Sequence, residues 1–491
     1  MRAIVIGAGF GGIASALRLC AKGYEVTLID RCEKLGGRAQ SFERNGFRHD
    51  AGPTVITAPF LFDELFDLFG EKLSDHITLV PLNPWYRFHF SNGEHFNYGG
   101  TLEDTLAEIH RIEPNDCDRY LKLLAHSNRI FDVGFTELST KSFHSFWFMM
   151  GQIPRLVQLK SYKTVWQLVC KYLKNENLRQ AFSIQPLLVG GNPFSTTSIY
   201  GLIHYLERAY GVHFAIGGTR AIVIALENLM RRHGVNILMA SSVKSLVLDS
   251  NVAKGVVLES GETMMADIII SDADPAYLYR NIIAPKHQSF WTRLKTKKPT
   301  FSMGLFVLYF GTTTVYPDIA HHTIWLGKRY QELLTDIFDN KILSDDFSLY
   351  LHRPTATDPS FAPPGCDSFY VLCPVPNLLG GQEWSVEGPK LRDRIISALD
   401  NTILPNLTKT ITEDFYETPT NFKNNYLSEH GAGFSIAPLF SQSAWFRFHN
   451  RAEGIKNLYL VGAGTHPGAG IPGVISSAKV VDSLIPFANT V

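Results

Sequence analysis

The N-terminal part of the chain alternates between short apolar runs and a cluster of glycines. Residues 4–6 are Ile, Val and Ile, which predicts a buried strand, and residues 7–12 contain four glycines. Apolar positions with helical spacing follow over 13–19, and a second apolar strand is predicted at 26–29. Asp30 comes directly after that strand. The pattern therefore predicts a strand–turn–helix–strand unit that ends on an acid.

This order is typical of a dinucleotide site. Gly7 allows the tight turn, Gly9 lets a pyrophosphate approach the backbone, and Gly12 lets the helix pack on the strand, with Gly11 between them. The helix N-terminus offers unpaired N–H groups and partial positive charge to phosphates. Asp30 stands where an acceptor for a ribose hydroxyl is expected.

A second glycine turn indicates which dinucleotide is bound. Gly36 and Gly37 permit a close backbone approach, and Arg38 adds a permanent cation that can bind phosphate. Pro53 and Thr54 follow in a further turn. At this position the turns resemble the extension that FAD-dependent oxidases and desaturases add to the Rossmann unit, so FAD is expected rather than NAD.

The pattern of predicted elements is discontinuous along the chain. Residues 102–210 are mostly helical in pattern, and a helix is predicted from 219 to 230. The remaining strands are predicted at 235–238, 243–248, 254–258, 266–274, 306–310, 347–351 and 370–374. The expected fold class is α/β, with a discontinuous Rossmann-like FAD-binding domain, a mixed α+β substrate domain and a helical, membrane-facing subdomain. The limits expected for these three parts are 1–85, 215–282 and 452–491 for the first, 86–101 and 283–451 for the second, and 102–214 for the third.

The C-terminal segment contains a strand over 457–461, a glycine loop over 462–470 and a final helix. A second dinucleotide site, for NADPH, is one interpretation of this loop. Too few residues follow it for another crossover and strand. The loop is therefore expected to complete the first site beside the flavin, with Gly462, Gly464, Gly473 and Val474 as cofactor-binding residues.

Charge and cysteine usage narrow the function classes. The 46 basic and 46 acidic residues cancel, so no nucleic-acid partner is expected. The six cysteines form no CxxC pair and no His/Cys metal spacing, which is typical of reduced thiols and predicts no metal site. A strand begins directly after the first two residues, leaving no room for a signal peptide. Since no apolar run is long enough to span a bilayer, a cytoplasmic protein, or one peripheral on the cytoplasmic face of a membrane, is expected.

Several longer segments carry a more specific resemblance. Beside the glycine turns and the C-terminal loop over 458–474, these segments are DAGPTVIT at 50–57, LVGGNPFSTTSIY at 188–200, DFSLYLH at 346–352, WSVEGPKLRD at 384–393 and QSAWFR at 442–447. With them the chain resembles the bacterial-type phytoene desaturases, carotenoid-forming members of the FAD-dependent amine oxidase and desaturase superfamily. In the FAD folds that it resembles, Val243 would place backbone groups against the adenine.

The resemblance implies stepwise removal of hydrogen from phytoene, a forty-carbon hydrocarbon, by hydride transfer to FAD. It favours lycopene over neurosporene as product and a quinone or oxygen as electron acceptor. At about 0.8 kcal/mol per buried CH₂, such a chain gains on the order of tens of kcal/mol on leaving water. The substrate is therefore expected to arrive from a membrane surface. The predicted membrane-contact residues, rich in aromatic rings and followed by cations, are Phe143, Phe146, Trp147 and Phe148.

Catalytic side chains are not indicated by the pattern. His466 in the flavin loop is a candidate proton acceptor, although a structural role is the alternative. Asp272 and Asp274 are interpreted as turn or cap residues, and Trp445 and Arg447 as part of a packing and ion-pair network. No dedicated base is needed if the proton leaves to flavin or water. Two other functions stay open: a carotenoid isomerase or a desaturase of a shorter or modified carotenoid, and a non-enzymatic lipid carrier.

Overall fold

The computed structural model describes residues 1–488, and its centre is a five-stranded parallel sheet with strand order β19-β13-β1-β2-β9. The bounds are β1 (Arg2–Ile6), β2 (Glu25–Ile29), β9 (Asn236–Leu238), β13 (Ile268–Ser271) and β19 (Leu458–Leu460). Buried Ile and Val side chains line both faces of β1, as is typical of a parallel strand covered on both sides. The apolar strand predictions in these segments are confirmed.

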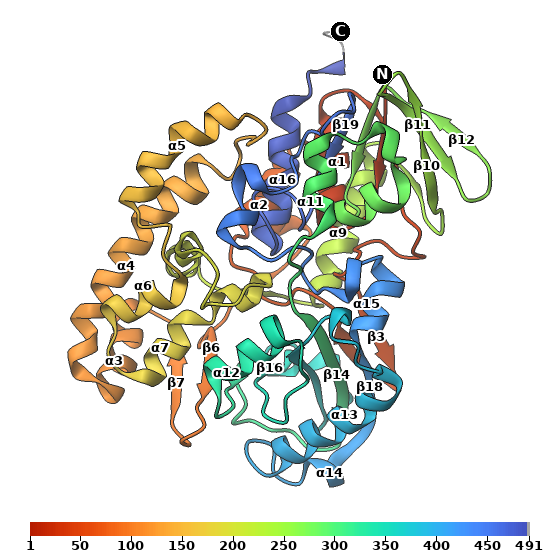
Figure 1. Cartoon of the computed structure of the whole chain (residues 1–491). Helices are drawn as coiled ribbons and strands as arrows, with labels where there is room; N and C mark the ends of the chain where they lie inside the picture. Colours follow the sequence, from red (N-terminus) through yellow and green to blue (C-terminus); the bar gives the residue numbers. More distant parts are fainter. Residues whose placement is uncertain (489–491) are drawn as a thin grey trace.

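Three helices pack on this sheet and share one apolar core with it (Figure 1). They are α1 (Phe10–Ala21), α9 (Thr219–Arg232) and α16 (Ile471–Leu484). The core therefore joins segments from the beginning, the middle and the end of the chain. Two small antiparallel units flank it, formed by β3 (Ser41–Arg44) with β4 (Phe47–Asp50) and by β10 (Val243–Asp249), β11 (Val252–Leu258) and β12 (Thr263–Met265).

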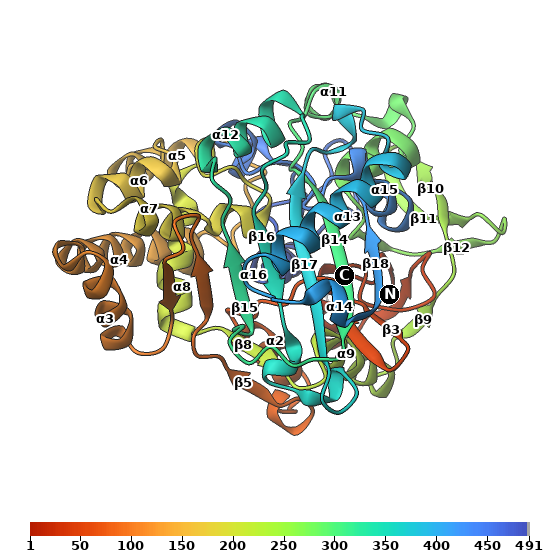
Figure 2. The same cartoon turned by 90° about the horizontal axis from the view of Figure 1, so that it is seen from below.

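A seven-stranded sheet forms the second body, with strand order β18-β14-β17-β16-β15-β6-β7. Its strands are β6 (Tyr86–His89), β7 (His95–Tyr98), β14 (Gly304–Thr312), β15 (His322–Trp325), β16 (Leu349–His352), β17 (Asp367–Val375) and β18 (Ile411–Glu417). Helix α13 (Trp384–Asp400) lies across one face of this sheet, where Leu391 and Ile395 join the apolar cluster of β14 and β17 (Figure 2). The sheet thus combines the early hairpin β6–β7 with strands from beyond residue 300.

Helices predominate between the two early hairpins and residue 210, and most of them gather at one side of the molecule (Figure 1). The helices of this part are α3 (Leu102–Ile112), α4 (Cys117–Phe131), α5 (Phe146–Gln158), α6 (Val165–Tyr172), α7 (Glu176–Ser183) and α8 (Leu202–Tyr210). Thr101 begins α3 with a capping box to Asp104. The other elements are α2 (Phe60–Asp67), α10 (Pro275–Tyr277), α11 (Phe290–Lys297), α12 (Tyr330–Thr335), α14 (Leu407–Thr410), α15 (Pro419–Tyr426), β5 (Leu79–Pro81) and β8 (His213–Ala215).

On the basis of the two sheets and the helical part, we propose three domains with the limits expected from the sequence. Across residues 1–488, no helix is both long and apolar enough to cross a membrane. All six cysteines are free thiols.

Candidate cofactor and substrate site

A cavity of about 600 Å³ lies where the two sheets and the helical part meet. The glycine turn after β1, the second glycine turn, the C-terminal loop and β16 all contribute to its wall. Most of the cofactor residues expected from the sequence line this cavity: Gly7, Gly9, Asp30, Gly36, Gly37, Arg38, Pro53, Thr54, Val243, Gly464, Gly473 and Val474. Sequence positions from the two ends and the middle of the chain therefore meet at one site.

Gly11, Gly12 and Gly462 lie behind the cavity wall. A Cβ at Gly12 would collide with the carbonyl oxygen of Gly7, so a glycine here permits the close contact between helix and strand that the sequence predicts. Gly7 itself has φ of 100°, in the region that favours glycine. The space beside Gly11 and Gly462 is taken by the carboxylate of Asp272.

Asp30 stabilises the first glycine turn through hydrogen bonds to the backbone. Its Oδ2 accepts a hydrogen bond from the backbone N–H of Ala8 at 2.6 Å, and its Oδ1 accepts one from the N–H of Cys32 at 2.7 Å. A carboxylate oxygen can accept more than one hydrogen bond, so both oxygens can also accept from a ligand hydroxyl. The position at the cavity wall suits the ribose-binding role expected from the sequence.

Asp272, which follows β13, has a position that the sequence did not reveal. Its carboxylate lies beside Gly9 and Gly11 at the N-terminus of α1, where the backbone N–H groups of Gly9 and Gly12 favour its charged form. Burial raises the pKa of this carboxyl to about 7, so it is neutral in mildly acidic solution. Asp272 therefore acts at a helix N-terminus, as the interpretation of it as a turn or cap residue implies. The N–H groups that it meets there are the ones expected to bind the phosphates. Asp274 caps α10, accepting from the N–H groups of Ala276 and Tyr277.

Arg38 reaches from the second glycine turn to a distant loop. Its Nη1 donates to the carbonyl oxygen of Gly433 at 2.6 Å, and its Nη2 donates to the hydroxyl of Ser428. Burial lowers the pKa of its guanidinium. Because Arg38 lines the cavity and has five N–H donors, it can hold this loop and still bind an anion.

Arg447 supports the C-terminal loop from behind. Its side chain is buried, its Nε donates to the carbonyl oxygen of Thr465 at 2.9 Å, and its Nη2 donates to that of Ala463 at 2.6 Å. The expectation of an ion-pair network for this residue was wrong in that respect, since the hydrogen bonds of Arg447 go to backbone carbonyls. The ion pair nearby is formed instead by Lys295 and Glu453, at 2.6 Å.

His466, the candidate proton acceptor, lines the cavity but is held in a structural position. Its Nε2 lies 3.0 Å from the carbonyl oxygen of Leu138, and its ring packs against Phe143 at 4.6 Å between centroids. Burial lowers the pKa of His466 to about 4, so the ring is a weak base at neutral pH. Its contacts favour an anchoring role for the flavin loop.

The part of the cavity away from the glycine turns is apolar. Its lining residues from the helical part and the large sheet include Ile184, Leu187, Ile199, Leu305, Leu349 and Leu372. Polar side chains also line the cavity, among them Tyr350 and Glu207. Tyr350 donates or accepts a hydrogen bond with the hydroxyl of Thr54 at 2.6 Å, and Glu207 accepts one from Tyr86 at 2.9 Å.

Glu207 is fully buried, and burial raises its pKa to about 8. The carboxyl is therefore neutral at neutral pH, which suits an apolar ligand. The sequence did not reveal Glu207 or Tyr350 because their places at the cavity come from long-range packing.

The four predicted membrane-contact residues differ in exposure. Trp147 is 80% exposed and Phe146 is 44% exposed, whereas Phe143 is only 3% exposed. Phe143 packs against Phe148 and His466 and lines the cavity, so its assignment as a membrane contact is corrected. Phe148 is half-buried. Within this aromatic segment, Phe143 therefore faces the cavity, whereas Phe146 and Trp147 are exposed at the surface.

The site can hold a dinucleotide with an attached ring system. The glycine turn and Asp30 suit a pyrophosphate and a ribose, and Val243 lies at the same end of the cavity wall as Ser241 and Ser242. The second turn comes close to the first, because a Cβ at Gly37 would lie 3.2 Å from the Cα of Gly9. The raised pKa of Asp272 allows a neutral carboxyl beside the phosphates.

Comparison with known proteins agrees with this geometry. Residues 10–481 match the family described as flavin containing amine oxidoreductase. The chain is 45% identical to the lycopene-forming phytoene desaturase of Pantoea ananas, over 98% of each chain. It is 40% identical to the neurosporene-forming phytoene desaturase of Rhodobacter capsulatus, covering 99% of this chain and 94% of that one. The crystal structure of an oxidoreductase from Methanosarcina mazei has a similar fold, with a TM-score of 0.69 at 17% identity, covering 98% of this chain and all of that one. The chain belongs to the flavin-containing amine oxidoreductase family, and its cofactor is FAD.

Proposed function

We propose that this protein is an FAD-dependent phytoene desaturase that forms lycopene in carotenoid biosynthesis. The observation that carries the proposal is its 45% identity, over 98% of both chains, to a phytoene desaturase of that product class. The apolar cavity wall supports it independently, because a hydrocarbon substrate has no polar group to be recognised.

FAD held by the two glycine turns, Asp30 and Arg38 would supply a hydride acceptor for one carbon of a single bond, with the proton of the neighbouring carbon passing to the reduced flavin or to water. The side chains of this protein hold that bond in place and exclude water. Thr54 and Tyr350 fix each other at the wall between the glycine turns and the apolar part of the cavity. Neutral Glu207 keeps charge away from the hydrocarbon.

Product analysis tests the proposed reaction. Purified FAD-loaded protein is incubated with phytoene in liposomes in the presence of oxygen or a quinone as electron acceptor, and the carotenoids are examined by mass and absorption. Loss of hydrogen with the spectrum of lycopene is the expected result, and a product that stops one desaturation earlier would indicate neurosporene. A product of unchanged mass would contradict desaturation and favour an isomerase.

Membrane contact is the second part of the proposal, and helix α11 supports it. Its polar side chains Thr292 and Thr296 are buried, whereas Phe290, Trp291 and Leu294 are 66%, 51% and 53% exposed. This orientation is the reverse of that found in an ordinary surface helix. An exposed apolar helix face is typical of a surface that meets lipid or another apolar partner.

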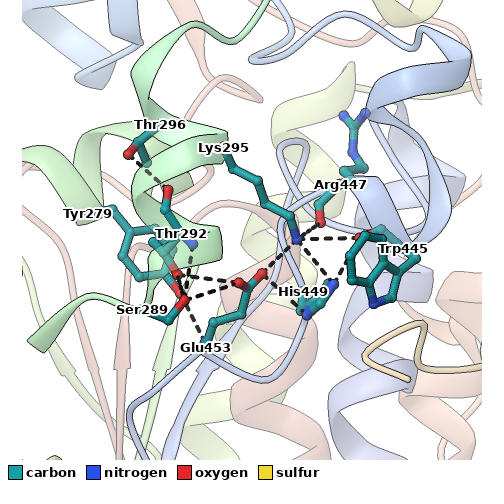
Figure 3. A network of polar contacts seen from close by, with 9 residues as sticks. All are labelled: Tyr279, Ser289, Thr292, Lys295, Thr296, Trp445, Arg447, His449 and Glu453. Carbon is teal, nitrogen blue, oxygen red and sulfur yellow. Dashed lines mark hydrogen bonds and ion pairs between the residues drawn. The ribbon is translucent and has the colours of Figure 1, made fainter. Parts of the chain in front are cut away.

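A buried polar network holds α11 in this orientation (Figure 3). The ammonium group of Lys295 donates to Glu453 at 2.6 Å and to the carbonyl oxygen of Arg447 at 2.9 Å. It also lies 3.1 Å from Nε2 of His449. Lys295 on the inner side of α11 therefore has several polar partners, and the apolar side of the helix faces outward.

Helix α5 continues the same surface. Trp445 contacts Phe146 of α5 and Trp291 of α11, with centroid distances of 5.2 and 5.7 Å. We call the exposed apolar side chains of these two helices the membrane surface. It consists of Phe146, Trp147, Met150, Ile153 and Val157 on α5 and Phe290, Trp291 and Leu294 on α11. Exposed Arg293, Lys297 and Lys298 beside it suit anionic lipid head groups.

The cavity extends to the inner side of α5, the helix whose outer side carries part of this surface, which supports substrate entry from the bilayer. Met149 and Leu156 of α5 line the cavity. Phe440 also lines it and is 52% exposed. A hydrocarbon can therefore pass from lipid into the cavity along an apolar wall, which avoids the cost of hydrating it. A membrane-dissolved quinone or oxygen is proposed as the electron acceptor.

A further inference from the structure

Three histidines outside the cavity form a buried cluster in the large sheet. His321 precedes β15, His322 begins it, and His352 ends β16. One ring nitrogen from each lies within 4.8 Å of those of the other two. The three ring centroids are 4.7, 4.8 and 5.4 Å apart, and the residues are 5%, 0% and 0% exposed. No short metal-ligand motif reveals this cluster, because His352 lies 30 residues after His322.

One nitrogen of each ring lies near a side-chain oxygen. The three pairs are His321 Nδ1 with Thr357 Oγ1 at 2.7 Å, His322 Nδ1 with Tyr350 Oη at 2.8 Å, and His352 Nε2 with Asp50 Oδ2 at 3.4 Å. Histidines that bind metals are held in this way, with the second ring nitrogen fixed by a carboxylate, hydroxyl or carbonyl oxygen.

The remaining nitrogens of the cluster have no partner. His321 Nε2, His322 Nε2 and His352 Nδ1 are buried and make no hydrogen bond within residues 1–488. A neutral imidazole has one unprotonated nitrogen, which can bind a metal ion. A buried nitrogen without a partner is costly unless something binds it.

We propose that His321, His322 and His352 bind a divalent transition-metal ion of the Zn²⁺ class. Three neutral imidazoles are the ligands that Zn²⁺, Co²⁺, Ni²⁺ and Cu²⁺ prefer. Around one tetrahedral ion with Zn–N distances of about 2.0–2.1 Å, imidazole ring centres lie roughly 5 Å apart, close to the spacing of these three rings. Asp50 places a carboxyl beside His352, as in the carboxylate–histidine–zinc arrangement.

The ion would bridge the β15 and β16 segments of the seven-stranded sheet, and Asp50 would link it to the FAD-binding side. Asp50 ends β4 and accepts a hydrogen bond from the N–H of Thr219 at the start of α9, on the FAD-binding side. On the other side, His322 contacts Tyr350, whose hydroxyl also contacts Thr54 at the cavity wall. The proposed role is therefore positional, and it does not depend on the proposed desaturation.

Metal content tests the proposal directly. The full-length holoprotein is prepared without a histidine tag, incubated with Zn²⁺, dialysed and analysed by elemental mass spectrometry. One Zn²⁺ per chain is expected, together with a rise in the unfolding temperature that a chelator reverses. H322N and H352N are each expected to lose the ion, whereas H89Q, in a half-buried histidine of β6 outside the cluster, retains it.

The wild-type measurement decides the case even if a variant fails to fold. Near-ultraviolet circular dichroism and FAD content identify such a variant. A folded wild-type holoprotein that retains no stoichiometric Zn²⁺ or Co²⁺ would overturn the proposal, and so would equal retention by folded H322N and H352N. A lack of desaturase activity would leave the metal measurement unaffected, so the two proposals fail separately.

Discussion

Asp272 connects FAD binding with pH at the level of a single side chain. Its carboxyl lies in the glycine turn and has a pKa of about 7, so it gains a negative charge above that pH. That charge opposes the pyrophosphate in the same turn. We expect the Kd for FAD to rise above pH 7, by up to about tenfold per pH unit, and D272N to bind FAD more tightly than wild type at pH 8 with little pH dependence. Fluorescence titration measures this.

D267N is the matched control, because Asp267 lies at the exposed start of the same strand. It should keep the pH dependence of the wild type. In an unfolded chain Asp272 loses its proton near pH 4, whereas in the folded protein it keeps the proton up to about pH 7. The free energy of unfolding therefore falls as the pH rises from about 4 to 7. This fall should be smaller in D272N. Equal weakening of FAD binding by D272N at all pH values would contradict this account.

Glu207 predicts a pH limit on the hydrocarbon side of the cavity. Its pKa of about 8 keeps it neutral below that pH, and its ionisation above it places a charge in the apolar wall. We expect desaturation to decline above pH 8 in the wild type. The E207Q variant, which keeps a neutral acceptor for Tyr86, should remain active there. A pH–rate profile measures both, and loss of activity in E207Q at every pH would instead make Glu207 a catalytic acid or base.

At the scale of elements, the orientation of α11 depends on a buried ion pair. Lys295 and Glu453 are 12% and 13% exposed at their side chains. Replacing Lys295 by Met leaves Glu453 buried without its cation, and we expect this to cost about 3–5 kcal/mol of unfolding free energy. K390M breaks an exposed pair with Glu387 and should cost less than about 1 kcal/mol. Urea unfolding compares the two, and similar losses would show that the network in Figure 3 does not hold the helix.

The membrane surface predicts lipid binding that two helices share. We expect the double variant W147S and W291S to reduce sedimentation with anionic liposomes at least tenfold, since two of its exposed aromatic side chains are lost. V386S removes an apolar side chain that is 50% exposed on α13 and should bind as the wild type does. Unchanged sedimentation of the double variant, with FAD content retained, would place the lipid contact elsewhere.

The elements that local pattern predicts are those with strong local signals. The strand at 4–6, the glycine turn and Asp30 could be predicted because they follow one another within thirty residues in the order that a dinucleotide site needs. Helix α11 was missed because it is short and exposes its apolar side, opposite to the usual rule. Phe143 was assigned to the surface because it lies in the same aromatic segment as Trp147. In the structure, Phe143 packs against His466 and is buried.

At the scale of the whole molecule, the missed site residues share one cause. Asp272, Glu207 and His352 acquire their roles only when strands and helices from distant parts of the chain meet. A single sequence contains no local signal for such long-range contacts. The cavity likewise exists only where both sheets and the helical part come together.

Anaerobic reduction of the flavin by phytoene tests the central claim most directly. The FAD-loaded protein is mixed with phytoene in liposomes without oxygen or quinone, and the absorption of oxidised flavin is followed together with the carotenoids. We expect the oxidised flavin band to fade as a carotenoid poorer by two hydrogens forms in equal amount, and to return when an acceptor is added. If the flavin stays oxidised in the presence of phytoene and the carotenoid keeps its mass, the protein is not a phytoene desaturase.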